Sequence, residues 1–192
     1  AFTFIGRCDF GSGGGSSLRK LVARKVVEMI KRKWGFDLDG TVICSMHRAL
    51  QTDSQADFLA DWVAHTPMQI LADKLLPLGK FMRRLIANGE DVFICTARNM
   101  SQADYMLLEL LGIDCKVIIS RANGDNRQDA IYKASRLKEQ FGEYLEGGGE
   151  IIFWDDKQDI RETLKNDLGI ICVDPQIYNG VNNDTMRAIT MH

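Results

Sequence analysis

The stretch KWGFDLDGTVI, residues 33–43, places two carboxylates at the end of an apolar run. The run has the composition of a buried β-strand, and Asp37 and Asp39 follow it with one leucine between them. Side chains alternate along a strand, so the two carboxylates are expected on the same face. Two like charges at close range are unfavourable unless a positive group lies near them. The stretch therefore predicts a site that holds a cation, a substrate surrounded by cationic side chains, or both.

The rest of the chain alternates between apolar runs and amphipathic segments. Residues 44–87 are expected to form a loop and helices, with Pro67 and Pro77 as breakers. Strands that are apolar throughout and alternate with helices are typical of a parallel sheet covered on both faces, which predicts a three-layer α/β fold. Further strands are expected in EDVFICTAR, DCKVIISR, EIIFWDD and IICVDP, and helices at 101–111, 128–145 and 157–167.

Polar residues follow most of these expected strands. In open α/β sheets, ligands bind at the carboxyl ends of the strands. Carboxylates gathered there favour a hard divalent cation, with Mg²⁺ as the leading candidate. One carboxylate can attack phosphorus, another can serve as acid and base, and cationic groups can stabilise the transferring phosphoryl group. The sheet is expected to bring together Asp37, Asp39, Thr96, Arg98, Lys133, Asp155 and Asp156.

The motif DxDGT at 37–41, followed by a threonine, a lysine and an acidic pair, resembles the haloacid dehalogenase (HAD) superfamily of phosphotransferases. The resemblance covers residues 34–175 and implies a Rossmann-like parallel sheet. It also implies a Mg²⁺ site formed by Asp37, the backbone carbonyl of Asp39, Asp155 and Asp156. For Asp155 and Asp156, a cap of the following helix is a second interpretation that is compatible with metal binding. The remaining implied roles are nucleophile for Asp37, general acid/base for Asp39, phosphate binder for Thr96 and charge stabiliser for Lys133.

The segment SRANGDNRQDAIYK, residues 120–133, is similar to the phosphatase domain of the bacteriophage polynucleotide kinase-phosphatase family. That resemblance implies substrate binding by Arg48, Arg98, Arg127 and Asp129, with Asp129 orienting Lys133. The alternative for Arg48, Asp125, Arg127 and Asp129 is a salt-bridge network that holds a loop. Lys157 stands where that family has an arginine, and GSGGGSS lacks the GK(S/T) ending of a phosphate-binding loop, so a kinase activity is not implied.

The expected function is a Mg²⁺-dependent phosphomonoesterase that acts through an aspartyl-phosphate, on a nucleic-acid 3′-phosphate end. The interval between Asp37 and Thr96 is too short for a large cap domain, so a small cap or none is expected, which leaves the site open to a polymer. A phosphatase for free nucleotides is the alternative enzyme. A non-catalytic binding protein on the same scaffold is the third hypothesis, because a fold does not fix a function.

The composition is that of an ordinary globular protein, with 45% hydrophobic and 26% charged residues. Five cysteines without a CxxC pair indicate buried free thiols in a reducing compartment. No apolar run approaches the roughly 18 residues of a membrane span, and the beginning of the chain does not read as a signal peptide. These features predict a cytoplasmic protein that does not bind membranes.

The N-terminal segment carries a concentrated positive charge. The first 33 residues contain eight of the 24 Lys and Arg residues but only two of the 26 acidic residues. Three interpretations remain open: an engineered fusion that precedes Met29, an added strand and helix, or a basic segment at 18–33 that contacts nucleic acid. The expected division is an extension at 1–28 and a HAD-like phosphatase domain at 29–192.

Overall fold

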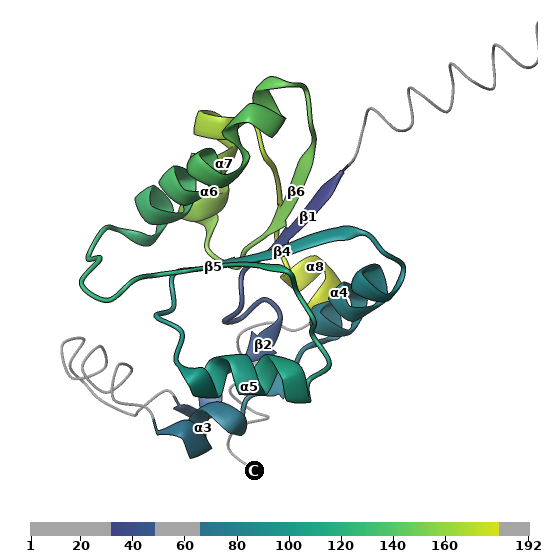
Figure 1. Cartoon of the computed structure of the whole chain (residues 1–192), viewed down its shortest axis with the longest axis vertical. Helices are drawn as coiled ribbons and strands as arrows, with labels where there is room; N and C mark the ends of the chain where they lie inside the picture. Colours follow the sequence, from purple (N-terminus) through teal and green to yellow (C-terminus); the bar gives the residue numbers. More distant parts are fainter. Residues whose placement is uncertain (1–31, 49–65, 181–192) are drawn as a thin grey trace, which may run out of the picture. The chain divides into compact units, whose positions relative to one another are not determined.

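The computed structural model describes residues 32–48 and 66–180. Its centre is a five-stranded sheet in which every neighbouring pair is parallel, in the order β5-β4-β1-β6-β7 (Figure 1). The first strand of the described residues thus lies in the middle of the sheet, between two later strands. The strands are β1 (Lys33–Phe36), β4 (Asp91–Thr96), β5 (Val117–Ser120), β6 (Ile151–Trp154) and β7 (Ile171–Val173).

Gly35 allows the central strands to pack closely. It pairs with Phe93 of β4 on one side and Phe153 of β6 on the other. A Cβ atom at Gly35 would lie 2.4 Å from atoms of both phenylalanine rings. Those rings stack over the glycine with their centroids 6.1 Å apart. Any larger residue at position 35 would therefore push the aromatic layer off the sheet.

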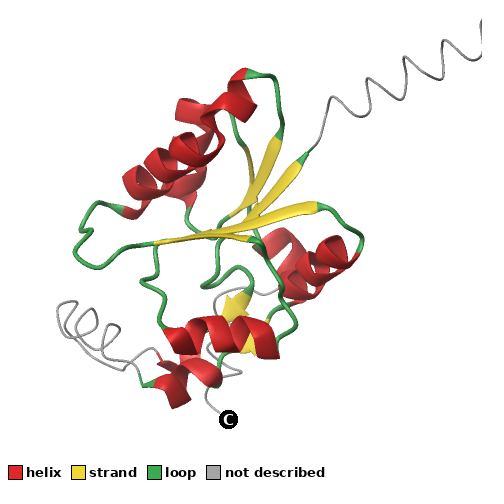
Figure 2. Ribbon diagram, viewed as in Figure 1, coloured by secondary structure: helices red, strands yellow, loops and turns green. Residues whose placement is uncertain are grey.

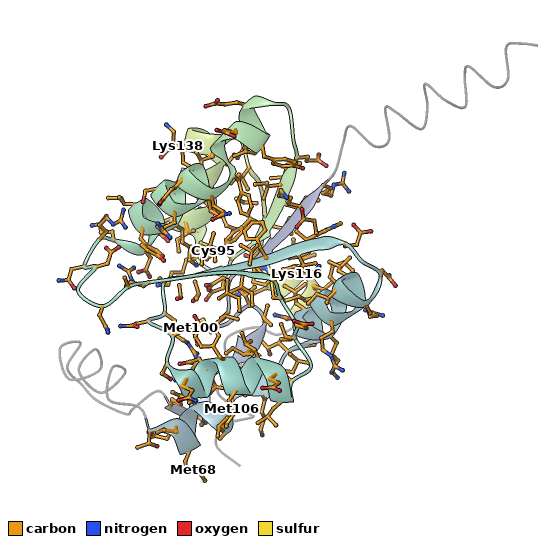
Figure 3. The ribbon with its side chains drawn as sticks, viewed as in Figure 1. Met68, Cys95, Met100, Met106, Lys116 and Lys138 are labelled. Atoms are coloured by element: carbon orange, nitrogen blue, oxygen red, sulfur yellow. The ribbon has the colours of Figure 1, made fainter. Side chains whose placement is uncertain are left out.

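Helices cover both faces of the sheet (Figure 2). One core contains Phe93, Cys95 and Phe153 with residues of α6 (Asp129–Glu146) and α7 (Gln158–Leu168). The other contains alternate strand residues with α3 (Pro67–Leu71), α4 (Pro77–Ala87) and α5 (Gln102–Leu110). In Figure 3, Cys95 lies inside the protein, whereas Met68 and Met106 lie near its edge. The predicted three-layer α/β fold is confirmed.

The helix boundaries agree with the sequence predictions to within a residue or two for α5, α6 and α7. The interpretation of Pro67 and Pro77 as breakers was incomplete, because each proline is the first residue of a helix. Proline suits that position because its missing N–H would have no partner inside the helix. Three short elements were not predicted: the antiparallel pair β2 (Ile43–Cys44) with β3 (Lys74–Leu75), and α8 (Gln176–Asn179).

Several predictions lie outside the described residues, namely the added strand and helix of the N-terminal segment, the boundary at Met29 and most of the basic segment at 18–33. The four cysteines within the described part are free thiols, as predicted, and Cys95 is fully buried. Within that part, no helix combines the length and the apolar character needed to cross a membrane.

Candidate active site

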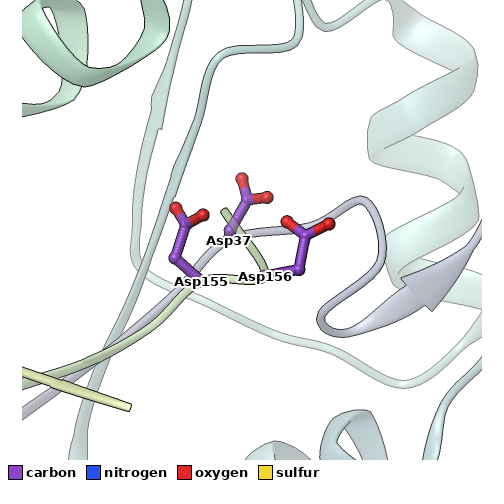
Figure 4. A group of neighbouring side chains, drawn as sticks. All are labelled: Asp37, Asp155 and Asp156. Atoms are coloured by element: carbon purple, nitrogen blue, oxygen red, sulfur yellow. The ribbon is translucent and has the colours of Figure 1, made fainter. Parts of the chain in front are cut away.

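Three carboxylates meet at the carboxyl edge of the sheet. Asp37 follows β1, and Asp155 and Asp156 follow the neighbouring strand β6. One oxygen from each lies within 4.8 Å of the other two, and Figure 4 shows the three side chains projecting to the same side of the backbone. Asp37 and Asp155 are buried, whereas Asp156 is exposed. These residues are called the carboxylate triad below.

Lys133 of α6 brings the positive charge to the carboxylate triad. Its side chain is 2% exposed, and its Nζ lies 2.8 Å from Asp37 Oδ1 and 2.6 Å from Asp155 Oδ2. The two aspartates raise the pKa of the Lys133 ammonium even though burial acts to lower it. Lys133 is therefore charged, and it fixes the nucleophile candidate Asp37 against Asp155.

One ammonium group does not balance three carboxylates. Burial raises the pKa of Asp37 to about 6, against the opposing effect of Lys133. Although Asp156 is exposed as a residue, partial desolvation of its carboxyl group by the surrounding protein, together with the nearby Asp37 carboxylate, raises its pKa to about 6. Burial also raises the pKa of Asp155. The triad thus has more negative charge than its surroundings stabilise, which is the condition that a bound cation relieves.

The donor set fits Mg²⁺. Hard divalent cations prefer oxygen ligands, and the triad supplies carboxylate oxygens from two adjacent strand ends without any sulfur or imidazole ligand. The exposed carboxylate of Asp156 leaves one side of the triad open to solvent. Among the described residues, Asp37, Asp155 and Asp156 are the group of side chains that could hold a metal ion.

Asp39 lies in a different environment from Asp37. Arg98 Nε donates to Asp39 Oδ2 at 2.9 Å, and Arg98 Nη2 donates to Asp39 Oδ1. Ser45 Oγ also donates to Asp39 Oδ1, at 2.6 Å. Burial acts to raise the pKa of Asp39, but the Arg98 guanidinium and these hydrogen bonds hold it below its ordinary value. β1 ends at Phe36 and the chain turns within residues 38–43, so both aspartates follow the strand, and their same-face arrangement stays a prediction.

Arg98 belongs to a buried network that reaches three carboxylates. Its Nη1 donates to Asp104 Oδ1 at 2.5 Å, and its Nη2 lies 3.4 Å from Asp73 Oδ2. Arg48 Nη2 donates to the same Asp73 oxygen at 2.6 Å and lies 3.7 Å from Asp39 Oδ1. We call these five residues the arginine cluster. It surrounds Asp39 with charges that are already paired.

Thr96 ends β4 at the same edge of the sheet and is almost fully buried. Its Oγ1 accepts a hydrogen bond of 3.1 Å from the Arg98 backbone N–H. The turn that carries Arg98 is therefore fastened to the strand end. Thr96 and Arg98 occupy the region that the sequence predicted for them, but both side chains have protein partners.

The segment 121–129 is held mainly by its own contacts. Arg127 is exposed, and its guanidinium binds Asp125 at 2.5 Å and Ser135 Oγ at 2.6 Å. Arg121 donates to the carbonyl oxygens of Ala97, Asp125 and Arg127. Neither arginine has a described contact with the carboxylate triad. The geometry thus agrees with the alternative of a salt-bridge network that holds a loop.

Asp129 does not hydrogen-bond to Lys133, contrary to the orienting role expected for it. Its two oxygens accept from Arg121 Nη2 at 2.7 Å and from Lys157 Nζ at 2.6 Å. Lys157 follows the acidic pair, so this contact links the start of α6 to the strand end of β6. Asp129 reaches the site indirectly, through the backbone that carries Asp155 and Asp156.

Comparison with known proteins assigns the chain to a family. A family described as bacteriophage T5 5′-deoxynucleotidase matches residues 23–191. The chain belongs to this family. The 5′-deoxynucleotidase of Escherichia phage T5 is 36% identical over 89 residues, which are 44% of this chain and 36% of that protein. The match therefore spans about a third of the length of this curated relative.

Solved structures show the fold that this 5′-deoxynucleotidase family member shares with HAD hydrolases. A haloacid dehalogenase-like hydrolase from Streptococcus pneumoniae aligns with a TM-score of 0.58 and 13% identity, over 83% of this chain and 91% of that one. A chain of a Pnkp1/Rnl/Hen1 complex aligns with a TM-score of 0.50 and 21% identity, over 76% and 46% respectively. The predicted HAD-like fold is confirmed.

Sequence reasoning missed three residues that shape the site in this family member. Asp104 carried a signal, because Ser101 and Asp104 have the spacing of a capping box, and the structure contains that box. Asp73 and Arg121 carried no comparable signal, because the sequence does not show which charged neighbour each one meets. Both residues act on the site through the arginines and carbonyl groups that they hold.

Proposed function

We propose that this protein is a Mg²⁺-dependent phosphatase that hydrolyses nucleoside 5′-monophosphates. The observation that carries the proposal is the carboxylate triad around Lys133 in a chain of the 5′-deoxynucleotidase family. The sequence had favoured a nucleic-acid 3′-phosphate, with free nucleotides as the alternative. Membership of the family supports the alternative, so we now place it first.

The chemistry begins with Asp37. One of its oxygens forms a bond to phosphorus as the bond between phosphorus and the ester oxygen breaks. Lys133, 2.8 Å from Asp37 Oδ1, holds the attacking carboxylate in position and stabilises negative charge on the phosphoryl group. Water then attacks the phosphorus of the aspartyl-phosphate, which releases inorganic phosphate and restores the Asp37 carboxylate.

Asp39 transfers the protons in both halves of the reaction. In the first half Asp39 reacts from its protonated form, which its lowered pKa makes the minor form in the free protein, and gives that proton to the departing nucleoside oxygen. In the second half the Asp39 carboxylate takes a proton from the attacking water. Arg98 acts through Asp39, because its Nε, Nη1 and Nη2 already donate to Asp39, Asp73 or Asp104. We therefore propose that Arg98 is a positioning residue, whereas Arg48 and Thr96 remain the candidates for contact with the phosphate.

When Mg²⁺ is bound, Asp37, Asp155 and Asp156 would hold it, with the Asp39 carbonyl as a further candidate ligand. The ion would supply positive charge beside the transferring phosphoryl group. Lys133 contributes the fixed part of that charge, and its contact with Asp155 orients one of the metal ligands. Arg161 holds the same segment by donating to the backbone carbonyl oxygens of Asp155 and Asp156, at 2.7 and 2.8 Å.

The second candidate substrate is a nucleic-acid 3′-phosphate end. The similarity of residues 120–133 to phosphatase domains of the polynucleotide kinase-phosphatase family supports it. We also propose that the basic segment 18–33 contacts nucleic acid, which would add affinity for such a substrate. The division into an extension at 1–28 and a phosphatase domain at 29–192 likewise stays a proposal. An oligonucleotide carries more negative charges than a free nucleotide, so its binding should weaken more steeply as the salt concentration rises.

A direct competition distinguishes the two substrates. Purified protein is given a deoxynucleoside 5′-monophosphate and a 3′-phosphorylated oligonucleotide, each alone and in mixture, with Mg²⁺ or with EDTA. We expect phosphate release from the monophosphate at the higher kcat/KM, and none in EDTA. Preference for the oligonucleotide would select the second candidate. Absence of release from both substrates would contradict the enzyme hypothesis and favour a binding protein.

A further inference from the structure

Asn179 lies far along the chain from the catalytic residues, yet it contacts the loop that carries them. It is the last residue of α8 and is 9% exposed. Its Nδ2 donates to the Thr41 carbonyl oxygen at 3.1 Å, across 138 residues of sequence. Residues 37–43, called the catalytic loop here, thus have a hydrogen-bond partner from the end of the described chain.

The other end of the same amide caps a helix. Asn179 Oδ1 accepts a 2.9 Å hydrogen bond from the backbone N–H of Leu78, the second residue of α4. Leu76, which precedes α4, makes no capping hydrogen bond with its side chain, and Pro77 has no N–H to satisfy. The first free donor of α4 is therefore satisfied from another element. The amide joins the start of α4 to the catalytic loop.

Contacts from outside already hold the first part of the catalytic loop, because Lys133 pairs with Asp37, Arg98 and Ser45 donate to Asp39, and the Asp37 amide donates to the Trp154 carbonyl oxygen at 2.9 Å. Inside the loop, the amides of Thr41, Val42 and Ile43 all donate to the Leu38 carbonyl oxygen. From outside, the Leu76 amide donates to the Val42 carbonyl oxygen at 2.9 Å. The carbonyl groups of Thr41 and Val42 are thus held by two contacts, one from Asn179 of α8 and one from the Leu76 amide just before α4.

α8 is well anchored for this task. The ring of Tyr178 packs on Phe81 of α4 with centroids 5.2 Å apart, and its hydroxyl accepts a 2.8 Å hydrogen bond from Arg84. These contacts fix the short helix against α4, beside which it lies in Figure 1. α8 therefore has a fixed position, and it holds the Asn179 side chain against the catalytic loop.

We propose that Asn179 is a positioning residue for the phosphatase reaction, which acts by holding the Thr41 carbonyl group and with it the placement of Asp39. The inference rests on the proposed function for its kinetic part. A side-chain amide is required at this position because one partner is a backbone donor and the other a backbone acceptor. An aspartate could accept from Leu78 but could not donate to Thr41.

That asymmetry supplies the test. Asn179→Asp keeps an acceptor for the helix and removes the donor to the catalytic loop, whereas Asn179→Ala removes both. Ile177→Ala is the matched control, because it changes a neighbouring side chain of the same helix that is 79% exposed and leaves Asn179 and the Tyr178 contacts in place. Loss of one buried hydrogen bond corresponds to roughly a five- to tenfold change in the equilibrium it supports. We expect kcat to fall by about this factor in both Asn179 variants, with KM within about twofold of wild type.

Amide hydrogen exchange provides a readout that does not depend on activity. We expect the amides of Thr41, Val42 and Ile43 to exchange about five- to tenfold faster in both Asn179 variants, while those of β4 stay unchanged. In Ile177→Ala, exchange in the loop and kcat should match wild type. Unchanged loop exchange, equal acceleration in β4, or faster loop exchange with a wild-type kcat would each overturn the proposal. If wild type releases no phosphate, the proposed function fails, and selective loop exchange alone decides whether Asn179 holds the loop.

Discussion

Asp37 and Asp39 are two residues apart, but the protein treats their carboxylates in opposite ways. Asp37 shares one ammonium group with Asp155, and burial raises its pKa to about 6. Asp39 is also shielded from solvent, but Arg98 and Ser45 outweigh burial and lower its pKa. One carboxylate thus lies in a region short of positive charge, and the other in a region where the charges are paired.

The contrast separates two tasks within one site. The carboxylate triad has one ammonium group beside three carboxylates, which favours the binding of a cation. In the arginine cluster, both guanidinium groups already pair with carboxylates, and we expect the cluster to act as a frame for Asp39. Sites that divide chemical roles between carboxylates commonly do so by giving them different environments. Each of the following experiments breaks or sharpens this difference.

The largest effect is expected from Asp37→Asn. The amide has nearly the shape of the carboxylate but cannot attack phosphorus, so kcat should fall by more than about a thousandfold. The fold should persist, because Lys133 keeps its contact with Asp155. Phosphate release and the circular dichroism melt are measured together. Asp167→Asn, at an exposed position of α7, is the control and should retain full activity. Substantial turnover by folded Asp37→Asn would rule out the covalent mechanism.

Arg98→Ala tests whether the arginine cluster is a frame. The substitution leaves Asp39 and Asp104 without their main partner in a buried region, and removal of one member of a buried ion pair typically costs about 3–5 kcal/mol. Urea denaturation should show a loss of this size in the free energy of unfolding. Arg136→Ala, which breaks the exposed pair with Glu139, should cost less than about 1 kcal/mol. Similar stabilities for the two variants would mean that the cluster does not stabilise the fold.

Mg²⁺ should stabilise the protein through the carboxylate triad. A ligand that binds only the folded state at a hundred times its Kd adds about 2.7 kcal/mol, which raises the Tm by several degrees. Differential scanning fluorimetry with Mg²⁺ and with EDTA measures the shift. Asp156→Asn removes an exposed ligand candidate and should reduce it, whereas Asp167→Asn should not. No shift in wild type at millimolar Mg²⁺ would argue against the metal site.

The smallest effect is expected from Arg127→Ala. The sequence suggested that Arg127 binds substrate, but its described partners are Asp125, Ser135 and the Tyr132 ring. We therefore expect kcat/KM to change by less than about twofold, since the exposed pair is screened by solvent. Arg48→Ala is the comparison, because Arg48 lies 3.7 Å from Asp39 and should lower kcat/KM at least tenfold. A large loss for Arg127→Ala in a stable protein would restore its role as a substrate ligand.

The sequence predicted the triad and its fold for one physical reason. An apolar run that is followed directly by Asp37, or by the pair Asp155–Asp156, indicates a buried strand with carboxylates at its carboxyl end. Because the carboxyl ends of parallel strands lie at the same edge of the sheet, these carboxylates are expected to meet. The argument from strand ends also placed Lys133 at the site, and the family resemblance added its role as charge stabiliser. The positions of these residues follow from the order of strands and polar residues along the chain, which can be read directly from the sequence.

The arginine cluster could not be predicted in the same way. Arg98 was recognised as a site residue, but which carboxylate a long side chain meets depends on packing between elements that are distant in sequence. Asp73 reaches Arg48 across 25 residues, and no local pattern marks that contact. The same holds for Arg121, which lies near Arg127 in the sequence and has entirely different partners. The sequence thus identifies the charged residues of the site, but it does not show which of them pair with one another.

The contacts around Arg48 also bear on how the substrate preference of such an enzyme can evolve. Arg48 ends one described segment and Thr66 begins the next, and the two segments are joined by the Arg48–Asp73 pair, by His47 Nε2 at 2.9 Å from the Gln69 carbonyl oxygen, and by β2 with β3. These contacts use residues of the described segments alone, so they do not depend on the identity of residues 49–65. Natural selection can therefore change the residues of that interval while the proposed phosphate chemistry at the edge of the sheet is inherited unchanged.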